Sequence, residues 1–221
     1  VLGVAMWRQL PESLHPSQAQ RFHVGSLLRG YWGMVSSRRF LALAFASGVP
    51  FNGMFLYVLS APVFLGEHLL LPPERFFVFF ILTIGGIMGG AWLSGRLAGR
   101  VLPKKQIRIG FSVMVGISIV NVVLNLLLPP SAWWSMLPPA VYAFGWALMV
   151  PVVTLLVLDL VPERRGMASS VQACIGAVAN GFVAGVISPL VMHSPRALAL
   201  ASAGMMGIGL VAWLWVKPRV T

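Results

Sequence analysis

Hydrophobic residues in this sequence are gathered in long stretches that short charged segments interrupt. Asp, Glu, Lys and Arg are all missing from five of them, namely 40–66, 76–95, 109–158, 166–195 and 197–216. A helix needs about 20 apolar residues to cross the hydrocarbon core of a bilayer. Four of the stretches are therefore long enough for one crossing each, whereas 109–158 is about twice too long for one crossing.

The long stretch 109–158 contains its own turn signal. Two proline pairs, Pro129-Pro130 and Pro138-Pro139, flank the tryptophan pair Trp133-Trp134. Proline interrupts helices, and tryptophan favours the interface between membrane and water. We therefore predict an all-α membrane protein with six spanning helices, at about 40–62, 76–95, 108–128, 137–158, 167–191 and 197–216.

The positions of the charges change how the formal net charge of +11 is interpreted. All sixteen basic residues except Arg75 and Arg196 fall on one predicted side of the membrane. Such an excess marks the cytoplasmic side of membrane proteins, so both chain ends are predicted to be cytoplasmic. The basic residues are spread over short loops with no stripe of interleaved aromatics, and we expect no nucleic acid as a partner.

Composition narrows the class further. Only 10% of the residues are charged and 58% are hydrophobic, which excludes an ordinary soluble domain. No predicted span has an ionisable residue at its centre, although such residues form the usual proton and ion sites. Gly-x-Ser-x-Gly and His-Glu-x-x-His motifs are both absent from the sequence. These absences argue against a six-span membrane enzyme. We therefore expect no enzyme activity, no metal site and no cofactor.

Outside the spans, the chain divides into three further segments. Residues 1–7 are apolar and resemble the end of a preceding membrane helix, residues 8–39 form a polar cytoplasmic loop, and residues 217–221 form a cytoplasmic tail. Two interpretations of the loop stay open, an amphipathic helix on the bilayer surface and an unstructured linker. The helix is suggested by apolar residues that share one helical face: Val24, Leu27, Leu28, Tyr31 and Val35.

Small residues and side-chain amides are the selective features of the predicted spans. Glycines from Gly85 to Gly90 allow close helix packing, and they also allow sliding during a conformational cycle. An amide in hydrocarbon needs a partner, so each one faces another helix or a cavity. Asn52 stands out at mid-span, between Pro50 and Phe55. The other residues that stand out form pairs that each share a helical face: Tyr142 and Trp146, Gln172 and Asn180, and Asn121 and Asn125.

Four charged residues near the cytoplasmic ends of the spans suggest a gate. Asp159 and Glu163 follow the fourth span, and Arg96 and Arg100 end the second. A partly desolvated pair between Arg96 and one of the acids would stabilise an outward-open state by about 1–3 kcal/mol. The alternative is that all four are solvated anchors that contribute well below about 1 kcal/mol each.

Several motifs carry a resemblance to a known family. They are MFLYVLSAPVFL at 54–65, with a Phe-x-Tyr-x-x-x-x-Pro pattern, LDLVPERRGMASSVQ at 158–172, WRQLPESL at 7–14 and SGRLAGR at 94–100. The last departs from the family's Gly-x-x-x-Asp-Arg loop motif, because Gly95 stands in place of Asp. Because these motifs occur in this order and with the predicted topology, the chain resembles the C-terminal half of a major facilitator superfamily transporter. It is most similar to the bicyclomycin/chloramphenicol resistance (Bcr/CflA-type) drug:proton antiporters.

The resemblance implies helices seven to twelve of a twelve-span protein of the bacterial inner membrane, with an N-terminal six-helix half as partner. It implies alternating-access export of small hydrophobic drugs or metabolites against protons, with the proton-coupling residues in that other half. Asn121 and Asn125 would pack helices. The implied substrate cavity contains Asn52, Phe55, Tyr142, Trp146, Gln172 and Asn180.

Two alternatives to drug export stay open at this point. A transporter of the same fold for a non-drug solute, either an importer or a metabolite exporter, has the same scaffold. A non-transporting remnant or membrane scaffold is the second alternative. We also expect that residues 1–221 alone do not transport, because the cavity needs a second half.

Overall fold

The structure, a computed structural model, describes residues 24–216. The expected end of a preceding helix at 1–7, the first part of the loop at 8–23 and the tail at 217–221 lie outside the described residues. Within residues 24–216, every regular element is a helix and no strand is present.

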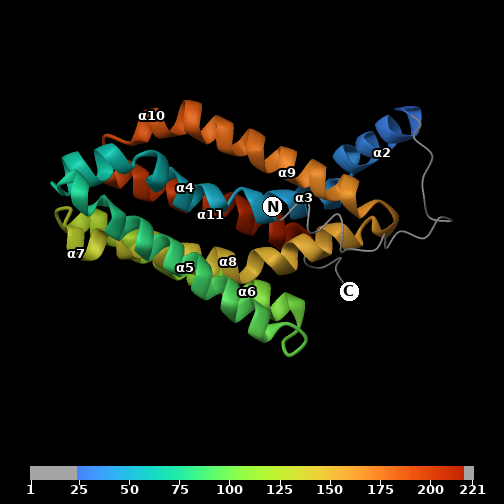
Figure 1. The fold of residues 1–221 in the computed structure, drawn as a ribbon, viewed down its shortest axis with the longest axis horizontal. Helices are drawn as coiled ribbons and strands as arrows, with labels where there is room; N and C mark the ends of the chain where they lie inside the picture. Colours follow the sequence, from blue (N-terminus) through green and yellow to red (C-terminus); the bar gives the residue numbers. More distant parts are fainter. Residues whose placement is uncertain (1–23, 217–221) are drawn as a thin grey trace, which may run out of the picture.

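The helices follow one another with short connections (Figure 1). The α-helices are α2 (Val24–Ser36), α3 (Arg38–Gly48), α4 (Phe51–Leu59), α5 (Phe76–Leu97), α6 (Pro103–Leu127), α7 (Ala132–Ser135), α8 (Leu137–Asp159), α9 (Arg165–Phe182), α10 (Ser188–Val191) and α11 (Pro195–Val216). Two π-helical segments, η2 (Pro62–His68) and η5 (Val183–Ile187), and two 3-10 turns, η3 (Pro73–Arg75) and η4 (Pro162–Arg164), complete the described chain.

The prediction of an all-α protein with six spans is confirmed. Five helical segments are long and apolar enough to cross a membrane, and the pair α3 and α4, which is bent by 42°, meets the same criterion together as a sixth candidate span. The fifth predicted span, 167–191, corresponds to α9, η5 and α10 in succession. The short helix α7 lies in the connection that contains Pro129-Pro130 and the tryptophan pair, as the turn signal predicted, and Pro138-Pro139 lie in the first turn of α8.

Helix α8 occupies the centre of the bundle. It packs against α5 and α6 on one side and against α3 and α4 on the other, while α11 packs against α3, α4 and α6 (Figure 1). Helix α9 packs mainly against α3. Large side chains such as Phe40, Ile107, Met149 and Phe79 are almost fully buried between these helices. Lipid tails are as apolar as the buried side chains, so the hydrophobic effect does not drive the helices together within a membrane. Close packing between helices therefore contributes much of the stability of such a bundle.

The first and fifth spans share a change of helix type. Each switches to a π-helical segment in the half remote from α2, and each has a proline there, Pro62 and Pro189. Proline lacks a backbone donor, and this loss favours local widening of the helix. The two spans are joined in this region by a buried contact between the Ser60 and Ser188 hydroxyls, at 3.2 Å.

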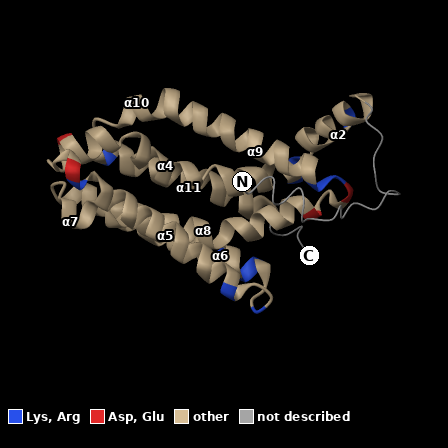
Figure 2. Ribbon diagram, viewed as in Figure 1, with Lys and Arg blue, Asp and Glu red and all other residues tan. Residues whose placement is uncertain are grey.

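Charged residues lie at the two ends of the bundle (Figure 2). Among residues 24–216, Arg75 and Arg196 lie at the end near α7, and all other Lys and Arg residues lie at the opposite end, which we call the basic end. The basic end includes α2, the connection between α5 and α6, and the connection between α8 and α9. Its assignment to the cytoplasm stays a prediction.

Candidate functional site

The first span is broken in its middle by Pro50. Because this residue has no backbone N–H, it cannot continue the helical hydrogen bonds of α3, and α4 begins only at Phe51. After Pro50, two backbone amides bond to the carbonyl three residues earlier, as in a 3-10 turn. The Asn52 amide donates to the Val49 carbonyl and the Gly53 amide to the Pro50 carbonyl, each at 3.0 Å. The break therefore leaves carbonyls at the end of α3, such as that of Ser47, without helical donors, and the Pro50 carbonyl has a second lone pair to satisfy.

Two aromatic side chains of α8 donate to these carbonyls. The Tyr142 hydroxyl donates to the Pro50 carbonyl at 2.8 Å, and the Trp146 indole Nε1 donates to the Ser47 carbonyl at 2.9 Å. Tyr142 and Trp146 are one helical turn apart, so the same face of α8 reaches both carbonyls. The structure thus brings two predicted cavity residues to the break itself.

An aromatic group lies beside the break. The Phe51 ring lies 5.0 Å from the Trp146 ring and 5.3 Å from the Phe55 ring, between ring centroids. All three side chains are half-buried, so each keeps part of its surface accessible. Ring contacts at these distances add attraction beyond the burial of apolar area.

An amide from the fifth span completes this region. The Gln172 amide Nε2 donates to the Ser47 hydroxyl at 2.9 Å and to the Thr154 hydroxyl at 3.2 Å. Spans one, four and five therefore meet at a single side chain. We call the six residues Ser47, Phe51, Phe55, Trp146, Thr154 and Gln172 the aromatic–amide cluster. It combines apolar rings with neutral donors and acceptors and contains no ionisable group, so it is suited to binding and not to acid–base chemistry.

Asn52 lies on another side of α4. It is fully buried, its Nδ2 donates weakly to the Gly48 carbonyl at 3.4 Å, and its Oδ1 has no hydrogen-bond partner. It lines a groove of about 560 Å³ whose other side chains are almost all apolar and come from α3, α4, α9 and α11. The structure therefore does not bring Asn52 to the aromatic–amide cluster.

Asn180 is also separate from the cluster. It follows Gln172 by eight residues on α9, which corresponds to about 12 Å along a helix. Its Oδ1 is buried and has no hydrogen-bond partner. Of the six predicted cavity residues, the structure thus groups Phe55, Trp146 and Gln172, places Tyr142 next to them, and sets Asn52 and Asn180 apart.

Three members of the cluster, Ser47, Phe51 and Thr154, were not predicted from the sequence. A signal for Ser47 was present, because a proline three residues later leaves carbonyls near it without helical donors. Thr154 also had a signal, since it follows Trp146 by eight residues and so shares its face of α8. Phe51 had no distinguishing signal, because its role depends on the angle between α3 and α4.

Asn121 and Asn125 are buried in helix contacts. The Asn121 Nδ2 donates to the Tyr57 hydroxyl at 2.8 Å, and the Asn125 Nδ2 donates to the Asn121 carbonyl at 2.8 Å. The Arg196 Nε donates to the Asn125 carbonyl at 3.1 Å. These bonds link α6 to α4 and to the start of α11, which is a packing role.

A double-mutant cycle tests this packing role. Asn121→Ala and Tyr57→Phe each remove one partner of the hydrogen bond, and we expect a coupling free energy of about 1 kcal/mol, the scale of interhelical bonds in membranes. Chemical unfolding of the chain in detergent micelles measures it for the two single variants and the double variant. Strictly additive effects would show that the bond contributes nothing.

Two charged residues of the expected gate, Asp159 and Arg96, have other contacts in this conformation. The Asp159 carboxylate pairs with Arg165 at 2.9 Å, the one ion pair among residues 24–216, and both side chains are 59% exposed. Arg165 reaches Asp159 because the connection between α8 and α9 is short. The Arg96 guanidinium lies 4.6 Å from the centre of the Trp92 ring. Pairing of Arg96 with Asp159 or Glu163 in an outward-open state stays a prediction, as does a gate role for Arg100.

Comparison with known proteins places this arrangement in a family. A comparison with curated proteins gives no significant match. The family model of the Major Facilitator Superfamily, in contrast, matches residues 1–184, which is most of the chain. The match includes the first four spans and most of the fifth, and with them every member of the aromatic–amide cluster. The chain therefore belongs to the Major Facilitator Superfamily.

Proposed function

We propose that this chain forms one half of a secondary transporter that exports small hydrophobic compounds in exchange for protons. Membership of the superfamily makes the chain part of a multi-pass membrane transporter; the substrate class, the export direction and the proton coupling are our proposal. The observation that carries it is the half-buried aromatic–amide cluster at the break of the first span.

The chemistry of the cluster favours substrates that are apolar with a few polar atoms. Phe51, Phe55 and Trp146 provide ring surface, and Gln172 and Thr154 provide neutral hydrogen-bonding groups. A charged substrate would find no ion-pair partner in the cluster and would lose its hydration without compensation. In the proposed site, Tyr142 supports the break, and Asn52 and Asn180 line neighbouring parts of the path.

The break at Pro50 gives the proposed site a means of changing shape. Alternating access requires an element with two arrangements, and a proline break whose carbonyls are held by side chains is such an element. Trp146 and Tyr142 hold the present arrangement through the Ser47 and Pro50 carbonyls. Release of these two bonds would allow α3 to tilt relative to α4.

Proton coupling is proposed to lie in the partner half of the transporter. The four acids of the described chain, Glu67, Glu74, Asp159 and Glu163, all lie at the ends of spans. Proton relays in membranes use acids at depth, and a second six-helix half would supply one. We further propose a bacterial inner-membrane location with the basic end in the cytoplasm.

Dye accumulation tests the proposed export. Efflux-deficient bacterial cells would express the longest reading frame that contains this chain, and the accumulation of a lipophilic fluorescent dye would be followed with and without a protonophore. We expect several-fold lower accumulation in expressing cells and loss of this difference with the protonophore. Equal accumulation with and without expression would contradict drug export, and higher accumulation in expressing cells would indicate an importer.

A further inference from the structure

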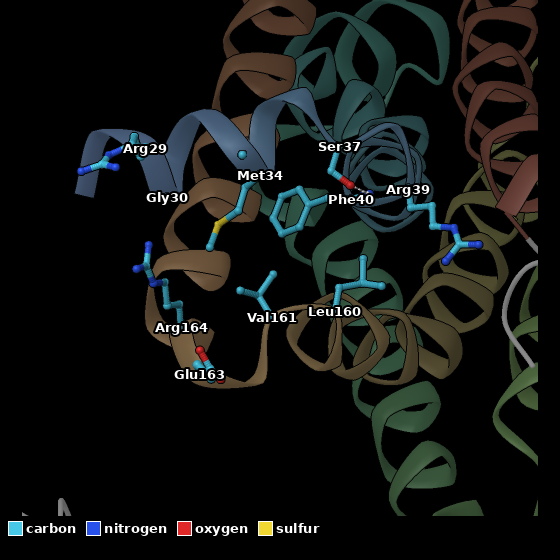
Figure 3. Close-up of a pocket in the computed structure, with 11 residues that line it drawn as sticks. Arg29, Gly30, Met34, Ser37, Arg39, Phe40, Leu160, Val161, Glu163 and Arg164 are labelled. Atoms are coloured by element: carbon cyan, nitrogen blue, oxygen red, sulfur yellow. Dashed lines mark hydrogen bonds between the residues drawn. The ribbon is translucent and has the colours of Figure 1, made fainter. Parts of the chain in front are cut away.

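A pocket of about 460 Å³ lies at the basic end, outside the region proposed to bind substrate. Its walls come from α2, the start of α3, and the connection between α8 and α9 (Figure 3). The floor is apolar, with Met34 and Phe40 buried and Val161 half-buried. Around this floor, the rim carries the charged residues Arg29, Arg39, Glu163 and Arg164. An apolar floor with a mainly cationic rim fits an amphipathic anion.

Arg164 is positioned by a contact with α2. Its Nη1 donates to the Ser26 carbonyl at 3.3 Å and lies directly against Gly30. A β-carbon at Gly30 would collide with this guanidinium nitrogen and approach the Met167 sulfur at 2.7 Å. Glycine at position 30 therefore makes room for the Arg164 head between α2 and the start of α9.

Arg29 and Arg164 form the cationic side of this pocket. Both side chains extend on the same side of it, from α2 and from η4, whereas Arg39 points away on the other side (Figure 3). The Arg29 Nε donates to the Gly25 carbonyl at 3.3 Å. Within the described part of the chain, neither arginine has an ion pair with a carboxylate, and the nearby Glu163 is exposed and unpaired as well. The pair is thus available to an external anion.

Helix α2 turns apolar side chains away from the bundle. The exposed fractions are 60% for Val24, 64% for Leu28, 73% for Trp32 and 46% for Val35. The helix ends at Ser36, and the first candidate membrane-crossing segment begins at Arg38, so α2 directly precedes that segment at the basic end. Exposed apolar side chains with neighbouring arginines are typical of helices that bind the interface of an anionic bilayer.

We propose that this pocket binds the phosphate of an anionic phospholipid from the adjacent leaflet. Arg29 and Arg164 pair with the phosphate, and the apolar floor of the pocket contacts the start of the acyl chains. The exposed apolar face of α2 lies in the interface of the same leaflet. Charge complementarity favours this occupant, because a zwitterionic lipid brings its own cation and offers less to two unpaired guanidinium groups. The apolar floor beneath the arginines favours a lipid over free phosphate, which has no apolar part.

Native mass spectrometry of the full chain in neutral detergent tests the site. The probes are dioleoylphosphatidylglycerol, dioleoylphosphatidylcholine and inorganic phosphate, each titrated alone and the last also as competitor. We expect phosphatidylglycerol to bind about tenfold more tightly than phosphatidylcholine, and Arg29→Gln and Arg164→Gln each to remove most of that preference. Gly30→Ala is expected to have the same effect by displacing the Arg164 head. Arg108→Gln, an exposed arginine of the basic end outside the pocket, is the matched control and should leave binding unchanged.

Three results would overturn the proposal. Equal affinity for the two lipids would show that the headgroup charge is not recognised. Inorganic phosphate that binds as tightly as phosphatidylglycerol and displaces it would identify a site for a free anion. Equal behaviour of the Arg29→Gln and Arg108→Gln variants would indicate attraction by the general charge of the basic end. Arg29 is exposed, so its variant keeps the test decisive if Arg164→Gln does not fold.

Discussion

Replacing Gly86 with alanine is expected to lower the free energy of unfolding by about 3 kcal/mol, the upper range for an overpacked contact. A β-carbon at Gly86 would overlap the Ala140 carbonyl oxygen of α8, and one at Gly90 would overlap the Phe144 carbonyl oxygen. Both obstacles are backbone atoms of the central helix and cannot turn aside. Helices α5 and α8 would have to separate along their whole contact.

Gly85 offers a matched control at the neighbouring position. It is exposed, and a β-carbon there meets no atom within 4 Å. Gly85→Ala is therefore expected to keep or raise stability by up to about 1 kcal/mol through helix propensity alone. Chemical unfolding of both variants in the same micelles gives the comparison. If Gly86→Ala were as stable as Gly85→Ala, the close contact between α5 and α8 would be wrong.

The Gly86→Ala and Gly85→Ala variants also distinguish two roles of these glycines, close packing of helices and sliding of helices during transport. Glycines in this span are compatible with either role by sequence alone. A glycine that only packs helices affects the amount of folded protein, whereas one that permits sliding also affects transport per folded molecule. We expect Gly86→Ala to act through the folded amount, because Ala140 faces it at backbone contact.

Replacing Gln172 with leucine is expected to reduce kcat/KM for export about tenfold, which corresponds to the loss of roughly 1.4 kcal/mol of interaction in the transport cycle. Leucine has a similar size but cannot donate to Ser47 and Thr154. The Ser47 hydroxyl keeps its bond to the Ala44 carbonyl at 3.0 Å, so the fold should lose little stability. This prediction rests on the proposed function.

Gln106 provides the control for this substitution. It is also a glutamine between spans, but it is 1% exposed and donates to the Ser94 hydroxyl at 2.7 Å and to the Leu148 carbonyl at 2.9 Å. Gln106→Leu should therefore cost stability, by about 1 kcal/mol, and leave transport per folded molecule unchanged. Initial export rates normalised to folded protein distinguish the two variants. Equal transport losses in both would contradict a specific role for Gln172.

The number and positions of the spans were largely predictable, because they depend on local sequence. The length of apolar stretches and the prolines between them predicted six spans, and the structure contains them with small shifts at their ends. The bend in the first span was not predicted, although Pro50 was its cause. Proline marks where a helix can bend, but neighbouring helices decide the angle.

The candidate site was predictable only in part. Helical spacing correctly placed Tyr142 and Trp146 on one face of α8, and both reach the broken first span. Spacing also put Asn180 with Gln172, yet only Gln172 reaches Ser47 and Thr154. Periodicity gives the face of a helix, but it does not give which helix that face meets or at what depth.

By itself, the sequence determined the all-helical membrane class, the number of spans and the concentration of basic residues at one end, because water, lipid and surface charge act on each segment separately. Only the tertiary structure decided which polar side chains meet. In the structure, Asp159 pairs with Arg165, and Gln172 donates to Ser47. The Arg164 guanidinium lies against Gly30. These contacts join residues of different helices, and their geometry depends on crossing angles and depths that no single segment specifies.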